Sequence, residues 1–151
     1  MENIFENFTI TILKLNKLVQ KIKNYEMQEY GLKTIHVMCG YYLKRRPEGL
    51  TASELAKLTL EDKAAISRAI KTMQEKGLVN YDANTYSSPI RLTDAGLKFA
   101  DDVCSKATRA VEAGSYDFTE AERVSFYKAL STIADNLTVY YKNLTNGHEE
   151  V

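Results

Sequence analysis

The chain lacks net charge and tryptophan and has few cysteines. Its 151 residues include 20 Lys and Arg balanced by 20 Asp and Glu, no Trp and two Cys. A neutral molecule does not attract polyanions as a strongly basic one does, so any binding of nucleic acid must depend on local charge. The length fits one domain of ordinary size and leaves no room for a second, catalytic domain.

The sequence also lacks the residue patterns of several functional classes. Cys39 and Cys104 lie far apart and in no CxxC spacing, which indicates neither a disulfide framework nor a zinc site. No stretch approaches the roughly 20 apolar residues of a membrane span. No Ser-His-Asp set, paired-carboxylate site, phosphate-binding loop or cluster of metal ligands is visible. We therefore expect a soluble, cytoplasmic protein that is not an enzyme and uses no cofactor or metal.

Two helical patterns occupy the first part of the chain. From Ile4 to the region 25–30, apolar residues recur at three- and four-residue steps, which predicts one long amphipathic helix. Gly31 interrupts the pattern, and a second helix follows it. This helix ends before Pro47, because proline biases the preceding residue away from helical conformation.

A helix-turn-helix is predicted next. Thr51 and Glu54 have the spacing of a capping box, which opens a short helix. After a break, either Thr59 or Asp62 can cap a further helix, and Gly77 lies where the C-terminal cap of that helix is expected. Two helices joined by so short a turn are typical of the helix-turn-helix.

A hairpin and two more helices complete the pattern. Residues 78–81 and 89–92 predict two short strands, and the loop 82–88 between them is polar. A helix then runs as far as the break at Gly114, and a second capping box opens a last helix whose apolar stripe reaches Leu144.

The predicted fold class is mainly α, a winged helix-turn-helix with long N- and C-terminal dimerisation helices and a small β-hairpin wing. In a single domain spanning residues 1–151, we assign residues 1–30 and 115–145 to the dimerisation helices. Residues 32–100 form the winged-helix DNA-binding region, which we call the head. One small head cannot cover both terminal apolar stripes, so we expect a homodimer.

Five segments in this order carry a family resemblance. They are Gly31-Leu32-Lys33-Thr34, Leu50-Thr51-Ala52-Ser53-Glu54-Leu55-Ala56, Glu61-Asp62-Lys63-Ala64-Ala65-Ile66-Ser67-Arg68-Ala69-Ile70, Lys76-Gly77-Leu78-Val79 and Leu92-Thr93-Asp94-Ala95-Gly96. In them the sequence resembles the MarR (multiple antibiotic resistance regulator) family. The resemblance implies a winged-helix dimer that usually represses genes for drug efflux, stress or aromatic-acid metabolism. Many members release DNA when a small, often phenolic, ligand binds, and a subset responds instead to cysteine oxidation.

The wing and the recognition helix depart from the family pattern. Wings of the family usually carry an Asp-x-Arg motif and further arginines for the minor groove, whereas residues 82–88 contain no basic residue and only Arg91 follows on the return strand. In the second helix of the predicted helix-turn-helix, the recognition helix, Ala64 and Ala65 stand where Ser or Thr is common in the family. An alternative function is therefore a winged-helix protein-interaction module with weak DNA binding.

The candidate partner is double-stranded DNA, bound as a pseudo-palindrome by the two heads of the dimer. A recognition helix places the first turns of its exposed face in the major groove, where Arg68 can bind a guanine bidentately. The alternative is that these cations only solvate a helix face, that the preceding helix is simply capped, and that Arg91 pairs with Asp82 or Asp94. The predicted DNA contacts are Ser53, Lys57, Lys63, Ala64, Ala65, Ser67, Arg68, Lys71, Thr72 and Arg91.

An effector site is predicted near the second helix, which lines the effector cleft in the family that the sequence resembles. The ten tyrosines can line an aromatic pocket, and we expect a small aromatic ligand. A packing role is the alternative for each candidate, and a thiol-based redox sensor using Cys39 or Cys104 is a further alternative function. The candidate effector residues are Tyr30, His36, Cys39 and Tyr42.

Overall fold

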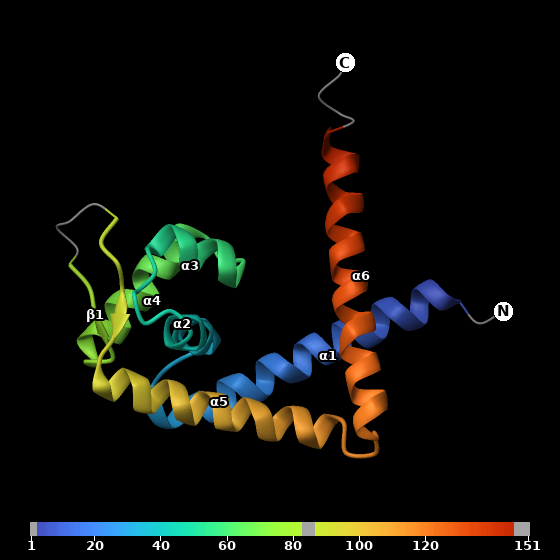
Figure 1. Ribbon diagram of the computed structural model, residues 1–151, viewed down its shortest axis with the longest axis horizontal. Coiled ribbons are helices and arrows are strands. Elements are labelled where there is room, and N and C mark those ends of the chain that lie inside the picture. Colours follow the sequence, from blue (N-terminus) through green and yellow to red (C-terminus); the bar gives the residue numbers. More distant parts are fainter. Residues whose placement is uncertain (1–2, 83–86, 147–151) are drawn as a thin grey trace. The chain divides into compact units, whose positions relative to one another are not determined.

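The computed structural model describes residues 3–82 and 87–146. These residues form a mainly helical structure with a two-stranded antiparallel hairpin, which confirms the predicted fold class. The chain divides into two compact units, Met1–Ala110 and Val111–Val151. The elements in order are α1 (Ile4–Met27), the 3-10 helix η1 (Gln28–Tyr30), α2 (Thr34–Lys44), α3 (Ala52–Thr59), α4 (Lys63–Glu75), β1 (Val79–Asn80), β2 (Arg91–Leu92), α5 (Asp94–Gly114) and α6 (Glu120–Asn146) (Figure 1).

Local capping chemistry sets the helix-turn-helix. Thr51 and Glu54 form the predicted capping box, in which the Thr51 N–H donates to Glu54 Oε2 at 2.8 Å and the Glu54 N–H donates to Thr51 Oγ1 at 3.2 Å. Of the two caps considered for α4, Asp62 is the one used, and its Oδ1 accepts from the Ala65 N–H at 2.8 Å. Thr59 instead donates its hydroxyl to the Leu55 carbonyl at 2.7 Å, which leaves it inside α3.

The inner face of α4 forms part of the core of the head. Ile66, Ala69, Ile70 and Met73 recur at three- and four-residue steps along α4, and all four are buried. Ile66, Ile70 and Met73 belong to one apolar cluster, which also includes Leu55 of α3 and residues of α2, β1 and α5. Burial of about four such side chains stabilises the head by several kcal/mol, at about 1.5–3 kcal/mol for each larger one.

The hairpin is shorter than predicted. Val79 pairs with Leu92 and Asn80 with Arg91, but the backbone groups at the ends of the predicted strand have other partners. The Leu78 N–H donates to the Met73 carbonyl at the end of α4. The Tyr81 carbonyl accepts from the Gln74 side chain at 2.7 Å. Residues 83–86 of the predicted polar loop lie outside the described residues.

A third segment, which the sequence did not indicate, pairs beside the hairpin. The Leu50 N–H donates to the Ile90 carbonyl at 3.1 Å, and the Ile90 N–H donates back at 2.8 Å. This bridge joins the residue before the capping box of α3 to the return strand of the wing. It therefore fixes the start of the helix-turn-helix to the wing.

The start of α5 approaches the wing too closely for any side chain at Gly96. Thr93 Oγ1 accepts from the Gly96 N–H at 3.0 Å and donates to the Gly77 carbonyl at 2.6 Å. A Cβ atom at Gly96 would lie 1.9 Å from the Leu78 carbonyl oxygen. Glycine is required here because the neighbouring atom is backbone and cannot turn away.

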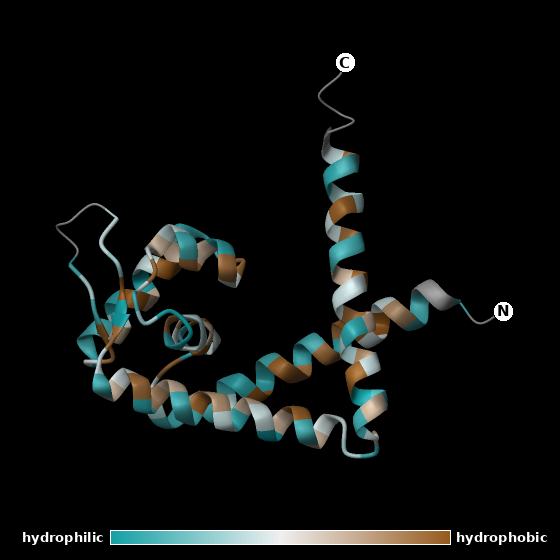
Figure 2. Cartoon of the chain, in the orientation of Figure 1, coloured by the Kyte–Doolittle hydropathy of each residue, from teal (hydrophilic) through white to brown (hydrophobic). Residues whose placement is uncertain are grey.

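Helix α6, in the second unit, begins with another predicted cap. Thr119 and Glu122 form a capping box, with the Thr119 N–H donating to Glu122 Oε2 at 2.8 Å. Hydrophobic residues recur along α6 (Figure 2), and within the single chain most of their side chains are exposed. Most apolar side chains described on α1 are exposed as well, whereas Met27 at its end is buried. None of the helices built from described residues is long and apolar enough to cross a membrane.

Replacing Gly96 by Ala should destabilise the fold, because the new methyl group would force the Leu78 carbonyl and the start of α5 apart. We expect a loss of at least about 1–3 kcal/mol in the free energy of unfolding, measured by urea titration. Gly114→Ala is the matched control, since no atom lies within 4 Å of a Cβ atom there. Equal stability of Gly96→Ala and the wild type would contradict the close approach.

Candidate nucleic-acid interface

The outer face of α4 presents three cations opposite the buried face. Lys63, Arg68 and Lys71 are exposed, and within the described part of the chain none of them is in a salt bridge. No acidic residue occurs between Lys63 and Gln74. Ala64 and Ser67 are also exposed on α4, and Ala65 and Thr72 are half-buried. The structure thus brings the predicted residues of α4 onto its accessible side.

The hydroxyl groups on α4 already donate to the helix backbone. Ser67 Oγ donates to the Lys63 carbonyl at 2.9 Å, and Thr72 Oγ1 donates to the Arg68 carbonyl at 3.1 Å. In these rotamers each oxygen can accept a hydrogen bond, but its proton is not available to a phosphate. Lys63, Arg68 and Lys71 are therefore the donors that α4 offers in this conformation.

The start of α3 is arranged for capping. Ser53 and Lys57 are exposed, as a phosphate contact requires. However, Glu54 accepts from both the N–H and the hydroxyl of Thr51, at 2.8 and 2.9 Å. The hydrogen bond from the Thr51 backbone lowers the pKa of Glu54, so its carboxylate is ionised at this end of the helix. That negative charge favours the capping alternative over a phosphate site.

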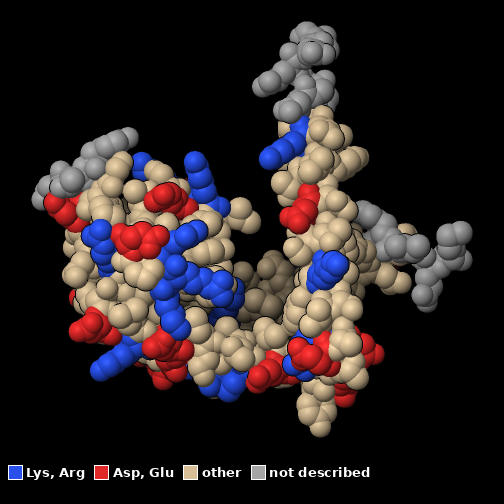
Figure 3. Space-filling view, viewed as in Figure 1, with Lys and Arg blue, Asp and Glu red and all other residues tan. Residues whose placement is uncertain are grey.

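The described part of the wing offers one cation. Arg91 is exposed on β2, and no salt bridge to Asp94 occurs among the described residues. The polar loop that departs from the family pattern falls mainly on residues outside the description. Figure 3 shows Lys and Arg side chains gathered over the head with Asp and Glu side chains between them. The positive charge is therefore local, as the neutral composition requires.

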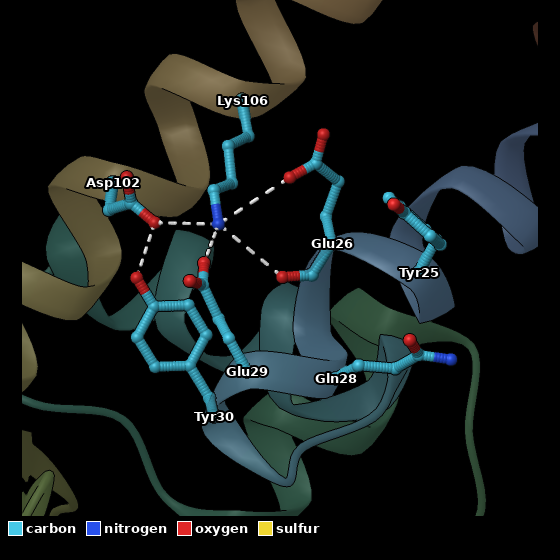
Figure 4. Close-up of a pocket in the computed structure, with 7 residues that line it drawn as sticks. All are labelled: Tyr25, Glu26, Gln28, Glu29, Tyr30, Asp102 and Lys106. Atoms are coloured by element: carbon cyan, nitrogen blue, oxygen red, sulfur yellow. Dashed lines mark hydrogen bonds and ion pairs between the residues drawn. The ribbon is translucent and has the colours of Figure 1, made fainter.

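Of the four candidate effector residues, Tyr30 lies at a pocket of about 580 Å³ between the end of α1, η1 and α5 (Figure 4). Its hydroxyl donates to Asp102 Oδ2 at 2.5 Å, and its ring packs edge-on against Phe99 with centroids 5.2 Å apart. The hydrogen bond to Asp102 raises the pKa of Tyr30 to about 12. The residues that line the pocket are Tyr25, Glu26, Gln28, Glu29, Tyr30, Asp102 and Lys106.

Lys106 joins the two sides of this pocket. Its Nζ lies 3.2 Å from Asp102 Oδ2 on the same helix and 3.4 Å from Glu26 Oε2, and it also pairs with Glu29. The hydrogen bond to Glu29 raises the pKa of Lys106, so the ammonium is charged. Three carboxylates against one ammonium leave the pocket negative. Asp102 and Lys106 have the i,i+4 spacing of an ion pair, but the sequence did not indicate their partners on α1 and η1.

The other three effector candidates do not line the pocket. His36 is buried, and its Nδ1 accepts from the Lys33 N–H at 2.9 Å at the start of α2. Burial lowers the pKa of His36, which favours the neutral ring that this cap needs. Tyr42 is half-buried, with its ring edge-on to Tyr41 at a centroid distance of 5.1 Å. Cys39 is fully buried in the core cluster. These contacts match the packing alternative.

Cys39 is protected from thiolate chemistry. Burial, and secondly the charge of Glu61, raise the pKa of its thiol to about 12, so very little thiolate forms at pH 8. We expect native Cys104→Ser protein to resist iodoacetamide at pH 8 and to react once unfolded in guanidinium. Rapid alkylation of the native variant would contradict this burial. Cys104 is half-exposed and remains the candidate for the redox alternative.

Comparison with known proteins identifies relatives of the fold. Residues 30–83 match the family model described as the MarR family. No curated protein matches the chain by sequence. Among solved structures, a MarR transcriptional regulator from Methanosarcina mazei Go1 is 21% identical with a TM-score of 0.79, over 92% of this chain and 94% of that one.

Two further structures are similar and contain a bound partner. The S. aureus MepR–DNA complex is 16% identical with a TM-score of 0.74, over 86% of this chain and 96% of that one. CouR from Rhodococcus jostii RHA1, bound to p-coumaroyl-CoA, is 16% identical with a TM-score of 0.76, over 89% of this chain and 96% of that one. At these identities the likeness establishes the fold.

Proposed function

We propose that this chain, which has the winged-helix fold of MarR-family transcriptional regulators, is a DNA-binding transcriptional regulator. The observation that carries the proposal is the outer face of α4, where Lys63, Arg68 and Lys71 are exposed with no acidic residue among them. In helix-turn-helix proteins the first residues of the second helix contact base edges in the major groove. The MepR–DNA complex supports the same use of the fold here.

Each residue of the interface has a role that fits its chemistry. Arg68 reads a guanine through its O6 and N7 atoms, because a guanidinium can bind both at once. Lys63 and Lys71 contact phosphates, and Ala65 can touch a thymine methyl group. The remaining proposed contacts flank the base readers, and those at the start of α3 are the weaker ones because the ionised Glu54 lies there. They are Ser53, Lys57, Ala64, Ser67, Thr72 and Arg91.

Arg68 and Lys71 should differ in what they contribute to binding. On a duplex selected by the wild type from a random pool, Arg68→Ala should lose about 1–3 kcal/mol and relax the preference at one base pair. Lys71→Ala should weaken binding to all sequences and lower the salt slope by about one, because one phosphate contact is lost. Fluorescence anisotropy titrations at several salt concentrations measure both effects.

The control for these variants is Lys128→Ala, which removes an exposed cation from α6, outside the head. It should leave both affinity and salt slope unchanged. Equal losses for Arg68→Ala on selected and random duplexes would refute its role as a base reader. If the wild type enriches no duplex, the protein-interaction module becomes the better account of this chain, whose net charge is zero.

We also propose that the chain acts as a homodimer through α1 and α6, so that two heads meet the two halves of a pseudo-palindrome. Long runs of exposed apolar side chains on a soluble protein mark interaction surfaces. On α1 they include Phe8, Ile12, Leu15, Leu18, Val19 and Ile22, and on α6 Ile133, Leu137, Tyr140, Tyr141 and Leu144. A second copy of the chain would bury these apolar side chains, which are exposed to water in the single chain.

Sedimentation equilibrium should give twice the chain mass of 17.1 kDa. Leu137 is 52% exposed in the single chain, so Leu137→Asp should spare the fold of the chain and shift the protein toward monomer. Asp135→Lys is the control, because two residues along a helix lie about 200° around its axis. A wild-type protein that is monomeric at micromolar concentration and has native helix content would contradict the proposed homodimer.

Repression relieved by a small aromatic ligand completes the proposal, with Tyr30, which alone of the four candidates lines the pocket, as the effector residue. CouR with bound p-coumaroyl-CoA supports an aromatic ligand for a fold of this kind. A ligand can release DNA only if it binds the DNA-free form more tightly. The duplex titration is therefore repeated with aromatic acids and with neutral aromatics, since the carboxylates around Tyr30 repel an acid. Unchanged affinity with every compound contradicts ligand release.

A further inference from the structure

The turn between α3 and α4 holds a leucine in a conformation that leucine rarely adopts. Leu60 has φ 59° and ψ 32°, in the left-handed region. Its side chain is 92% exposed, the highest value among the large apolar side chains that the structure describes. Residues with a Cβ atom are disfavoured in this region, and helices that end this way usually use glycine or asparagine.

The fold gains nothing visible from the leucine side chain. The end of α3 is closed by backbone groups, with the N–H of Leu60 and the N–H of Glu61 both donating to the Ala56 carbonyl. Glycine at this position would keep both hydrogen bonds and would adopt the same φ and ψ without strain. A bulky, exposed apolar side chain in a strained position is a reason to look for a role outside the fold.

Leu60 lies at the end of α4 that the proposed function places in the major groove. It comes two residues before Asp62, the cap of α4, and three before Lys63, the first exposed cation of α4. A chain spans at most about 3.6 Å per residue, so Leu60 is within about 11 Å of Lys63 along the backbone. The side chain therefore extends into solvent beside the proposed base readers.

Resting on that proposed function, we propose that Leu60 is a further specificity-determining residue, whose side chain contacts the C5 methyl group of a thymine. The thymine methyl is the apolar group that base pairs present in the major groove. A phosphate is a poorer neighbour, because the exposed carboxylates of Glu61 and Asp62 adjoin Leu60. A protein partner fits less well, because protein interfaces need apolar patches of several hundred Å², and the large apolar side chains described as exposed on the helix-turn-helix are only Leu58, at 40%, and Leu60.

The test uses the duplex that the wild type selects from a random pool, with each thymine replaced in turn by deoxyuridine, which lacks the methyl group. At the thymine that Leu60 contacts, the wild type should lose about fourfold in affinity, the value of one buried methyl group, apart from any loss at a thymine that Ala65 contacts. Leu60→Gly and Leu60→Asn should bind the thymine duplex more weakly and be indifferent to the replacement of that one thymine. Leu60→Met, which remains apolar, should retain the discrimination.

Stability separates this role from damage to the fold. Leu60→Gly should raise the midpoint of thermal unfolding, because it removes the strain, while it lowers affinity for the thymine duplex. Leu97→Asn, which changes an exposed leucine of α5 outside the helix-turn-helix, should keep the discrimination of the wild type.

Two outcomes overturn the inference in different ways. If Leu60→Gly keeps both the affinity and the thymine discrimination of the wild type, Leu60 does not contact a base. A protein partner then becomes the better explanation for its exposed side chain. If the wild type enriches no duplex at all, the proposed function itself fails, and the inference that rests on it fails too.

Discussion

The burial of one side of α4 is the constraint on which the rest of the head depends. Ile66 and Met73 have no exposed surface and Ile70 almost none, so the rotation of α4 about its own axis is fixed by packing. Because the helix repeats every 3.6 residues, fixing the apolar side also fixes which residues face outward. Replacing such a residue by alanine typically costs about 2–5 kcal/mol. The same core that stabilises the head therefore aims Arg68 and its neighbours.

Features that depend on neighbours in sequence could be predicted, whereas those that depend on distant partners could not. The capping boxes at Thr51 and Thr119 need only a residue three positions away, and both are present. The bridge from Leu50 to Ile90 joins segments 40 residues apart, and neither segment carries a signal for it. The left-handed conformation of Leu60 was missed for a related reason: the usual signal is a glycine, and here the backbone adopts the conformation without one.

The residues of the candidate site also differ in whether their placement depends on neighbours in sequence or on distant partners. The exposed residues of α4 follow from the periodicity of a single helix, so the sequence was sufficient to place them on one face. The effector candidates were chosen from their positions near α2, and a helix pattern does not say which neighbour each side chain meets. His36 is engaged at the start of its own helix, and Cys39 lies in the core. Tyr30 meets Asp102 and Lys106, which are more than 70 residues away in the chain.

The junction at Lys106 bears on the order in which the chain folds. Its contact with Glu29 closes a loop of 77 residues that contains the entire helix-turn-helix. Closing so long a loop costs more chain entropy than forming a helix or a tight turn, so contacts of this kind tend to form after local ones. The head can thus assemble from contacts within the loop before α1 is fastened to α5. Weakening the contacts of Lys106 would therefore mainly raise the rate of unfolding, through detachment of α1, and would change the folding rate of the head little.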